Sequence, residues 1–169
     1  MIQSDSQLRD LFLKGMSRAA ATVSVVTTDG PAGRLGVTVS AMTSVSADGA
    51  APTMLVCVHH QSAAAAAILE NGCFCINVLR AGQSAISDIF ANRLPAPGGD
   101  RFETGGAVPM ATGAPRLVDP LVAFDCSLIS GEHVGTHHLF IGAVEDVHIA
   151  EGQPLLYGNR SYLKSQPQD

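Results

Sequence analysis

The sequence predicts a mainly β domain, an antiparallel β-barrel with peripheral α-helices. About seven segments carry the alternation or the β-branched content of strands. Turn-forming residues separate most of them, so that the strands group as hairpins. Only three short segments show helical periodicity, and they do not alternate regularly with the strands, which disfavours a doubly wound parallel sheet. The 169 residues are expected to form one domain, 1–169.

The first expected element is a helix over residues 4–20. Ser4 and Gln7 have the spacing of a capping box. Apolar side chains recur at three- and four-residue steps and form one stripe, made of Leu8, Leu11, Phe12, Met16 and Ala19. Such a stripe predicts a helix that packs on the rest of the domain.

A hairpin is expected next, with strands at residues 21–28 and 36–46 joined by the turn-forming residues 29–33. The second strand, G-V-T-V-S-A-M-T-S-V-S, alternates apolar and hydroxyl-bearing side chains, and residues 43–46 have the composition of a hydroxyl-rich turn. Hydroxyls and free N–H groups at the end of a strand can cradle a phosphate and the polar edge of a ring. An ordinary half-buried strand with a Ser/Thr outer face fits the same pattern.

The remaining elements follow from similar signals. Strands are expected at residues 53–59, 73–79, within 116–130, and at 136–149 and 155–157. Ser62 is a good N-cap for a helix that ends at Gly72, and residues 83–91 form another helix. Residues 92–106 are rich in Pro and Gly and are expected to be a loop, and Gly131 to Gly135 a turn.

Composition limits the classes of function. Hydrophobic residues make up 46% of the chain and charged residues 15%, as in globular proteins. A net charge of −5 without a Lys/Arg cluster argues against nucleic-acid binding. The sequence lacks an apolar run of membrane-spanning length and a signal sequence, so we expect a cytoplasmic protein without a membrane partner. The four cysteines contain no C-x-x-C and are expected to be free buried thiols.

Common catalytic motifs are absent from the sequence. There is no Rossmann glycine motif, no Walker A motif and no G-x-S-x-G. Six histidines are the richest polar feature, but Gly131 and Gly135 interrupt the helix that His133 and His137 would need to bind a metal at i, i+4, so no metal site is predicted. His137 and His138 are neighbours in a strand and point to opposite faces, so that one can face a cleft. An exposed or structural histidine fits either position as well.

Taken in order, the segments resemble the flavin reductase-like family, which has the FMN-binding split-barrel fold. The matching segments are V-S-V-V-T-T-D-G (23–30), G-V-T-V-S-A-M-T-S-V-S (36–46), M-L-V-C-V-H-H-Q-S (54–62), F-C-I-N-V-L (74–79) with Gln83, D-I-F-A (88–91), D-R-F (100–102), G-T-H-H-L-F-I-G-A-V (135–144) and P-L-L-Y (154–157). They cover nearly the whole chain, and the ordered set is more specific than any one motif.

The resemblance implies an NAD(P)H-dependent flavin reductase. It implies a homodimer with flavin near the subunit interface and a separate oxygenase that receives reduced flavin. The expected cofactor is FMN, with FAD as the alternative, and the expected hydride donor is NADH, with NADPH as the alternative. The resemblance also implies site residues: flavin contacts at Thr38, Ser40, Ala41, Met42, Thr43, Ser44 and Ser46, phosphate contacts at His60, Gln61 and Ser62, a ring contact at Phe102, and a catalytic or positioning role beside the nicotinamide for His137.

The chain departs from the family pattern at three places. Residues 48–52 read D-G-A-A-P, where the family often has Asp-Pro-Pro. His59, His60 and Gln61 precede Ser62, where the family often has a permanently charged basic residue. Thr136 replaces the Asp of a frequent Gly-Asp-His motif, which removes the carboxylate that would orient His137. Three other functions stay open: a reductase of the same fold for a corrinoid or ferric chelate, a flavin- or haem-binding module without turnover, and a structural barrel without a ligand.

Overall fold

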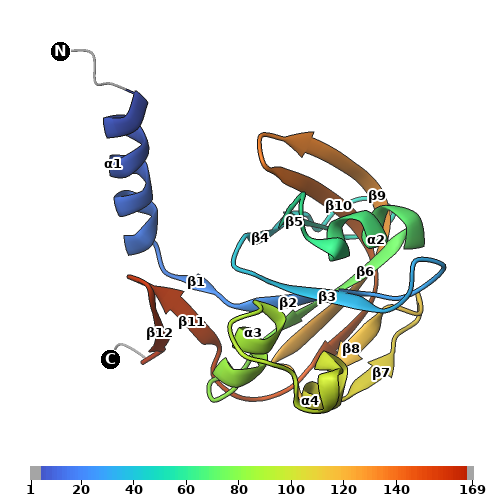
Figure 1. Cartoon of the computed structure of the whole chain (residues 1–169). Coiled ribbons are helices and arrows are strands. Elements are labelled where there is room, and N and C mark those ends of the chain that lie inside the picture. The colour runs from blue at the N-terminus through green and yellow to red at the C-terminus, as the bar shows by residue number, and fades with distance from the viewer. Residues whose placement is uncertain (1–4, 167–169) are drawn as a thin grey trace.

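The computed structural model describes residues 5–166 and is mainly β (Figure 1). Its elements are α1 (Asp5–Arg18), β1 (Ala21–Thr22), β2 (Ser24–Thr28), β3 (Leu35–Val39), β4 (Met42–Ser46), β5 (Thr53–His59), α2 (Ala63–Asn71), β6 (Cys73–Val78), α3 (Ser84–Phe90), the 3-10 helix η1 (Pro97–Gly99), α4 (Arg101–Gly105), β7 (Ala107–Pro109), β8 (Pro115–Leu117), β9 (Val122–Val134), β10 (His137–Ile149), β11 (Leu155–Gly158) and β12 (Ser161–Lys164).

A seven-stranded antiparallel sheet forms the body, in the order β3-β2-β6-β9-β10-β5-β4. β3 and β4 are separated in the chain only by Ser40 and Ala41, yet they are the two outer strands of this sheet. The sheet must therefore curl until its edges approach each other, and the Cys57 N–H donates to the Ala41 carbonyl (3.0 Å) beside this corner. The predicted fold class, a mainly β antiparallel barrel with peripheral helices, is confirmed in the form of a strongly curled antiparallel sheet.

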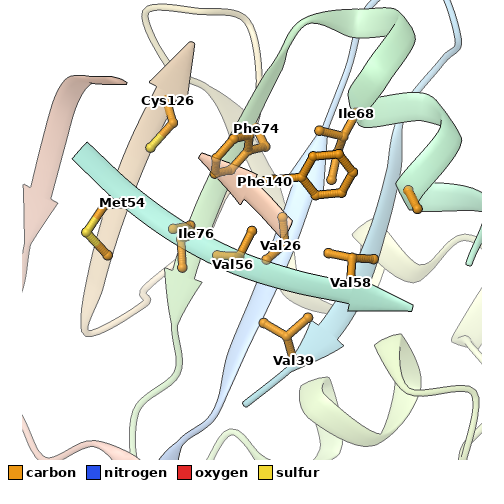
Figure 2. Packing of buried hydrophobic residues seen from close by; sticks show 11 residues of the cluster. Val26, Val39, Met54, Val56, Val58, Ile68, Phe74, Ile76, Cys126 and Phe140 are labelled. Atoms are coloured by element: carbon orange, nitrogen blue, oxygen red, sulfur yellow. The ribbon is translucent and has the colours of Figure 1, made fainter. Parts of the chain in front are cut away.

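Apolar side chains from the inner face of the curled sheet form the main core (Figure 2). Along β5, Met54, Val56 and Val58 are buried and the residues between them are less so, which is the period of two expected for a strand with one covered face. Ile68 of α2 covers one end of the core. The core also holds Val26, Val39, Phe74, Ile76, Cys126 and Phe140. Each fully buried side chain of this size contributes roughly 1.5–3 kcal/mol.

A buried polar group ties the long connection between α3 and β9 to the sheet. Asn77 of β6 is fully buried, and its amide nitrogen donates to the Val25 carbonyl and to Thr27 Oγ1, both at 3.1 Å. Its amide oxygen accepts the Leu117 N–H at 2.8 Å. Because a buried amide needs partners, Asn77 fixes β8 against β2 and β6.

The expected strand at residues 21–28 is divided at Val23. β1 pairs with β11 in a small three-stranded sheet, whereas β2 belongs to the main sheet. Val23 lies at the junction: its N–H donates to Leu155 and its carbonyl accepts from Leu79, each at 2.9 Å. The prediction of one continuous strand was wrong because the chain changes partners there.

Two turns were also predicted at the wrong places. Residues 43–46 are strand β4, paired with β5, rather than a hydroxyl-rich turn. Likewise β9 runs through Gly131 to Val134, and the tight turn consists of Gly135 and Thr136. Gly131 pairs with Phe140 within the strand, and its glycine serves packing: a Cβ there would lie 2.7 Å from the Leu69 side chain and 2.8 Å from the Phe140 ring.

The predicted helices lie where the sequence placed them, but they do not all pack as expected. α2 ends, as predicted, at Gly72, whose φ of 69° is left-handed. Residues 92–106 contain η1 and α4 rather than a plain loop. α1 extends away from the body and has no buried residue, so the expected packing helix is uncovered in the single chain (Figure 1). Its expected capping residue, Ser4, lies outside the described residues.

The cysteines behave largely as predicted. All four are free; Cys73, Cys75 and Cys126 are buried, and Cys57 is partly exposed. Burial raises the pKa of the Cys126 thiol to about 12, with Asp125 and Glu145 adding to the effect, so this thiol stays protonated at neutral pH. In residues 5–166, no helix is long and apolar enough to cross a membrane.

We expect Gly142→Ala to destabilise the fold. A Cβ at Gly142 would lie 2.6 Å from the Phe74 ring and 2.7 Å from Cys126 Cβ, and both neighbours are core side chains that cannot move freely. Overpacking of this kind costs about 1–3 kcal/mol in the free energy of unfolding, measured by urea denaturation. The control is Glu151→Ala, at an exposed position outside the helices and strands, where a change below ~0.5 kcal/mol is expected. A Gly142→Ala protein as stable as the wild type would contradict this packing.

Candidate functional site

A cleft of about 620 Å³ lies between β3, the start of α2 and the segment from α3 to α4. This volume suits a cofactor-sized ligand. Its walls are built from three stretches that are distant in sequence: Arg34, Leu35, Gly36, Val37 and Thr38; His59, Gln61, Ser62, Ala63 and Ala64; and Phe90, Ala91, Asn92, Gly99, Asp100, Arg101 and Phe102.

One end of the cleft is the N-terminus of α2. Ser62 occupies the N-cap position with an extended backbone, but its hydroxyl makes no capping hydrogen bond. The N–H groups of the first turn, including those of Ala63 and Ala64, have no partner within the helix. Together with the positive end of the helix dipole, these donors make an arrangement that favours an anion.

The opposite wall is an aromatic platform held by an ion pair. Phe102 is only 6% exposed and packs edge-to-face on Phe90, with ring centroids 5.2 Å apart. The Arg34 guanidinium lies 4.6 Å from the centre of the Phe102 ring and pairs with Asp100 at 2.9 Å. Asp100 also accepts the Phe102 N–H at 2.9 Å and so caps α4. Asp100 therefore fixes both the ring and the cation above it.

A second cation, Arg101, lies at the same rim. Its guanidinium donates a hydrogen bond to the Asn92 side chain, and both residues line the cleft. The cleft thus has two arginines as well as the start of a helix, and of the two only Arg34 forms an ion pair with a carboxylate among the described residues. An anionic ligand suits this local charge although the whole chain is acidic.

Five of the six histidines gather beside the α2 end of the cleft, and we call them the histidine cluster: His59, His60, His133, His137 and His138. Their rings form a row, with centroids 5.1 Å apart for His137 and His59, 5.0 Å for His59 and His60, 5.3 Å for His60 and His133, and 5.0 Å for His133 and His138. Among the described residues, no group of three or more His, Cys, Asp or Glu side chains is arranged to hold a metal ion.

Within this cluster, His137 and His138 have different surroundings. His137 is exposed, and its Nδ1 lies 3.0 Å from the Thr136 hydroxyl, which takes the place of the missing carboxylate. His138 stacks on Phe140 and is half-buried, and its Nδ1 is buried without a hydrogen-bond partner in the described structure. Burial lowers the pKa of His138, and the neighbouring His133 and His60 lower it further.

The structure brings some of the predicted site residues together. Thr38, Gln61, Ser62 and Phe102 all line the main cleft. His60 does not line the cleft, but its ring contacts that of His59, which does line it. His137 also reaches the cleft only through His59.

The rest of the predicted residues, those from 40 to 46, leave the cleft. Ser40 lines a neighbouring cavity of about 150 Å³, which shares Thr38 and Ala91 with the cleft. A separate apolar hollow of about 480 Å³ runs along β4 and is lined by Met42, Thr43, Ser44 and Ser46, among others. Ala41 lines none of these three and lies at the corner between β3 and β4. The division arises because the chain bends at Ser40 and Ala41, whereas the prediction continued the strand past these residues and placed a turn at residues 43–46.

Several cleft residues could not be recognised from the sequence. Arg34 follows a turn, and nothing local shows that it reaches Asp100 and Phe102. No sequence motif marked Asn92 or His59 as a residue of the cleft. Asp100 could have been found, because an Asp immediately before a short polar-apolar run is a common N-cap.

Comparisons with known proteins agree with this fold. The profile of the family described as flavin reductase like domain matches residues 16–165. An FMN reductase (NADH) named RutF 1, from Methylorubrum extorquens, is 44% identical over 153 residues, which are 89% of this chain and 74% of that protein.

Two solved structures share the whole architecture. The flavin reductase PheA2 matches with a TM-score of 0.84 at 28% identity and covers 98% of this chain and 100% of its own. BorF, the flavin reductase component of a bacterial two-component tryptophan halogenase, matches with a TM-score of 0.79 at 30% identity and covers the same shares. The chain therefore belongs to the flavin reductase like domain family.

Proposed function

We propose that this single-domain chain is an NADH-dependent FMN reductase that supplies reduced flavin to a separate monooxygenase. The observation that carries the proposal is a cleft that joins a helix N-terminus at one end to an aromatic and arginine wall at the other. The relative from Methylorubrum extorquens, named an FMN reductase that uses NADH, supports the choice of both cofactors.

The residues of the cleft fit FMN, which has a phosphate at one end and a flat tricyclic ring at the other. The Ser62 hydroxyl and the first-turn N–H groups of α2 would hold the phosphate, since this hydroxyl is not used to cap the helix. Thr38 of β3 and Phe102 would border the ring system. A cleft of about 620 Å³ lies within the usual range for such ligands.

For hydride transfer, the protein mainly has to position NADH and FMN relative to each other. Bound FMN supplies an acceptor for the hydride that NADH donates. The chain must hold the two rings in contact and exclude water, and such positioning can contribute several kcal/mol. Phe102, fixed by Asp100 and Phe90, offers a rigid flat surface for this purpose. His137 stands at the rim beside His59, where we propose that it positions the nicotinamide.

A homodimer is part of the proposal, and α1 supports it. Four large apolar side chains of α1 are between half and two-thirds exposed: Leu8, Leu11, Phe12 and Met16. They form the stripe predicted from the sequence, so the helix has an apolar surface suited to packing that the described residues of the same chain do not bury. A second copy of the chain would cover it. BorF, named as a component of a two-component enzyme, supports the separate partner that receives reduced flavin.

Anaerobic addition of NADH to the protein with excess FMN is expected to bleach the flavin absorbance near ~450 nm. Bleaching of many equivalents of FMN is expected, because a reductase that supplies a partner must release its reduced flavin. The control is the same mixture without protein, and a parallel run with NADPH ranks the two donors. Bound FMN that neither donor bleaches would overturn the proposal and favour a binding module without turnover.

Ser62→Ala is expected to weaken FMN binding about 10-fold, since a hydrogen bond to a charged group contributes about 1.5–3 kcal/mol. Riboflavin, which has no phosphate, should bind the variant as it binds the wild type. The melting temperature should hardly change, because the hydroxyl makes no capping bond. Titration calorimetry measures both ligands. Ser84→Ala, at the start of α3 and outside the cleft, is the matched control. Equal losses for FMN and riboflavin would place the phosphate elsewhere.

Phe12→Ser is expected to weaken the dimer at least about 10-fold, as truncation of a central apolar anchor does at protein interfaces. Light scattering coupled to size-exclusion chromatography, run over a range of concentrations, measures the effect. Asp10→Ser, on the polar side of the same helix, is the control and should leave the dimer intact. A monomeric wild type, or a Phe12→Ser protein that dimerises as the wild type does, would remove α1 from the interface.

A further inference from the structure

The histidine cluster is assembled by strand pairing rather than by local sequence. In the register of β5 and β10, His137 lies opposite His59. In the hairpin of β9 and β10, His138 lies opposite His133. His60 comes directly after β5 and contacts both His59 and His133. Imidazoles from three strands therefore form one continuous row that begins at the cleft wall with His59.

The row has few fixed charges around it. β5 contributes only His59 and His60 to this surface, and β10 only His137 and His138. β9 contributes His133 and Glu132. The strand register places the exposed Glu132 opposite Leu139, on the same face as His137 and His59, so one fixed negative charge lies on that side of the row. The start of α2 brings no charged side chain, and the far cleft wall brings the Arg34–Asp100 pair and Arg101. No ion pair recorded for residues 5–166 includes a histidine.

Crowding of this kind limits how many protons the row can hold. An imidazole titrates in the physiological range, and a proton on one ring disfavours protonation of the next. Protonation of His138 is disfavoured for a second reason: the ring is half-buried, and its Nδ1 has no partner in the described structure that would stabilise a charged ring. An anion placed at the end of the row would offset the repulsion, and the nearest anion site is the N-terminus of α2, three residues after His59.

We propose that the histidine cluster takes up a proton when a phosphate enters the cleft at α2, so that pH sets the affinity for the phosphorylated ligand. The proposal rests on the proposed function, in which that ligand is FMN. Uptake of protons on binding means that affinity rises as the pH falls and decreases as the pH rises through the imidazole range. A permanently charged lysine or arginine at this place would give no such dependence.

The cluster would then act as a specificity device for phosphorylated flavin. FMN binding should depend on pH, whereas riboflavin binding should not, since riboflavin brings no negative charge to the row. His133 and His138 do not line the cleft, so they would act on the phosphate only through their neighbours. They are positioning residues, and their effect should appear in proton uptake rather than in direct contact with the ligand.

Titration calorimetry at about pH 7.5 tests this, because a phosphate monoester with a second pKa near 6 is then almost fully ionised. FMN is titrated in two buffers with different ionisation enthalpies, which gives the number of protons taken up. We expect roughly half a proton for FMN and none for riboflavin. His133→Gln and, separately, His138→Gln are expected to reduce the uptake by at least half. His148→Gln, the sixth histidine and outside the cluster, is the matched control and should leave it unchanged.

The outcomes separate this inference from the function on which it rests. Failure of both FMN and riboflavin to bind would overturn the proposed function, and the inference with it. FMN binding without proton uptake, or with the same uptake in His133→Gln and in wild type, would overturn only the inference. Equal uptake with riboflavin, or an equal loss in His148→Gln, would also overturn it. His133 is exposed, so its variant remains informative even if the half-buried His138→Gln fails to fold.

Discussion

Strands β3 and β4 are consecutive in the chain but lie at opposite edges of the seven-stranded sheet, and this constraint shapes the rest of the molecule. Only two residues, Ser40 and Ala41, cross from one edge to the other, so the sheet has to curl. The curl encloses the apolar core and brings β3 next to the start of α2 (Figures 1 and 2). The cleft lies where these two elements meet, and its position is thus a consequence of the topology.

The site combines parts that differ greatly in how firmly they are held. Ser62 and the first turn of α2 rest on a helix whose inner face, including Ile68, is buried in the core. Phe102 comes from a long connection, but Asp100, Phe90 and the buried Asn77 network anchor that connection on both sides. The histidine cluster, in contrast, lies mostly at the surface of the β9–β10 hairpin, where its protonation can respond to solvent and ligand.

The sequence was most informative where local patterns decide the structure. The strands β5 and β6 and the N-cap and glycine C-cap of α2 were all predicted, and the ordered motifs indicated the family. Local patterns failed where distant contacts decide. The chain changes partners at Val23 and bends at Ser40, and neither event has a local signature. Arg34 reaches Asp100 across a contact between segments distant in sequence, and strand register brings His59, His133, His137 and His138 together.

The central claim is that the N-terminus of α2 holds the phosphate of the flavin. A crystal structure of the FMN complex tests it most directly, through the position of the phosphorus atom. We expect phosphate oxygens within hydrogen-bond distance of the Ser62 hydroxyl and of the first-turn N–H groups of α2, with the ring system running toward Thr38 and Phe102. A phosphate in the apolar hollow along β4, or in any place away from Ser62, would show that α2 does not hold it.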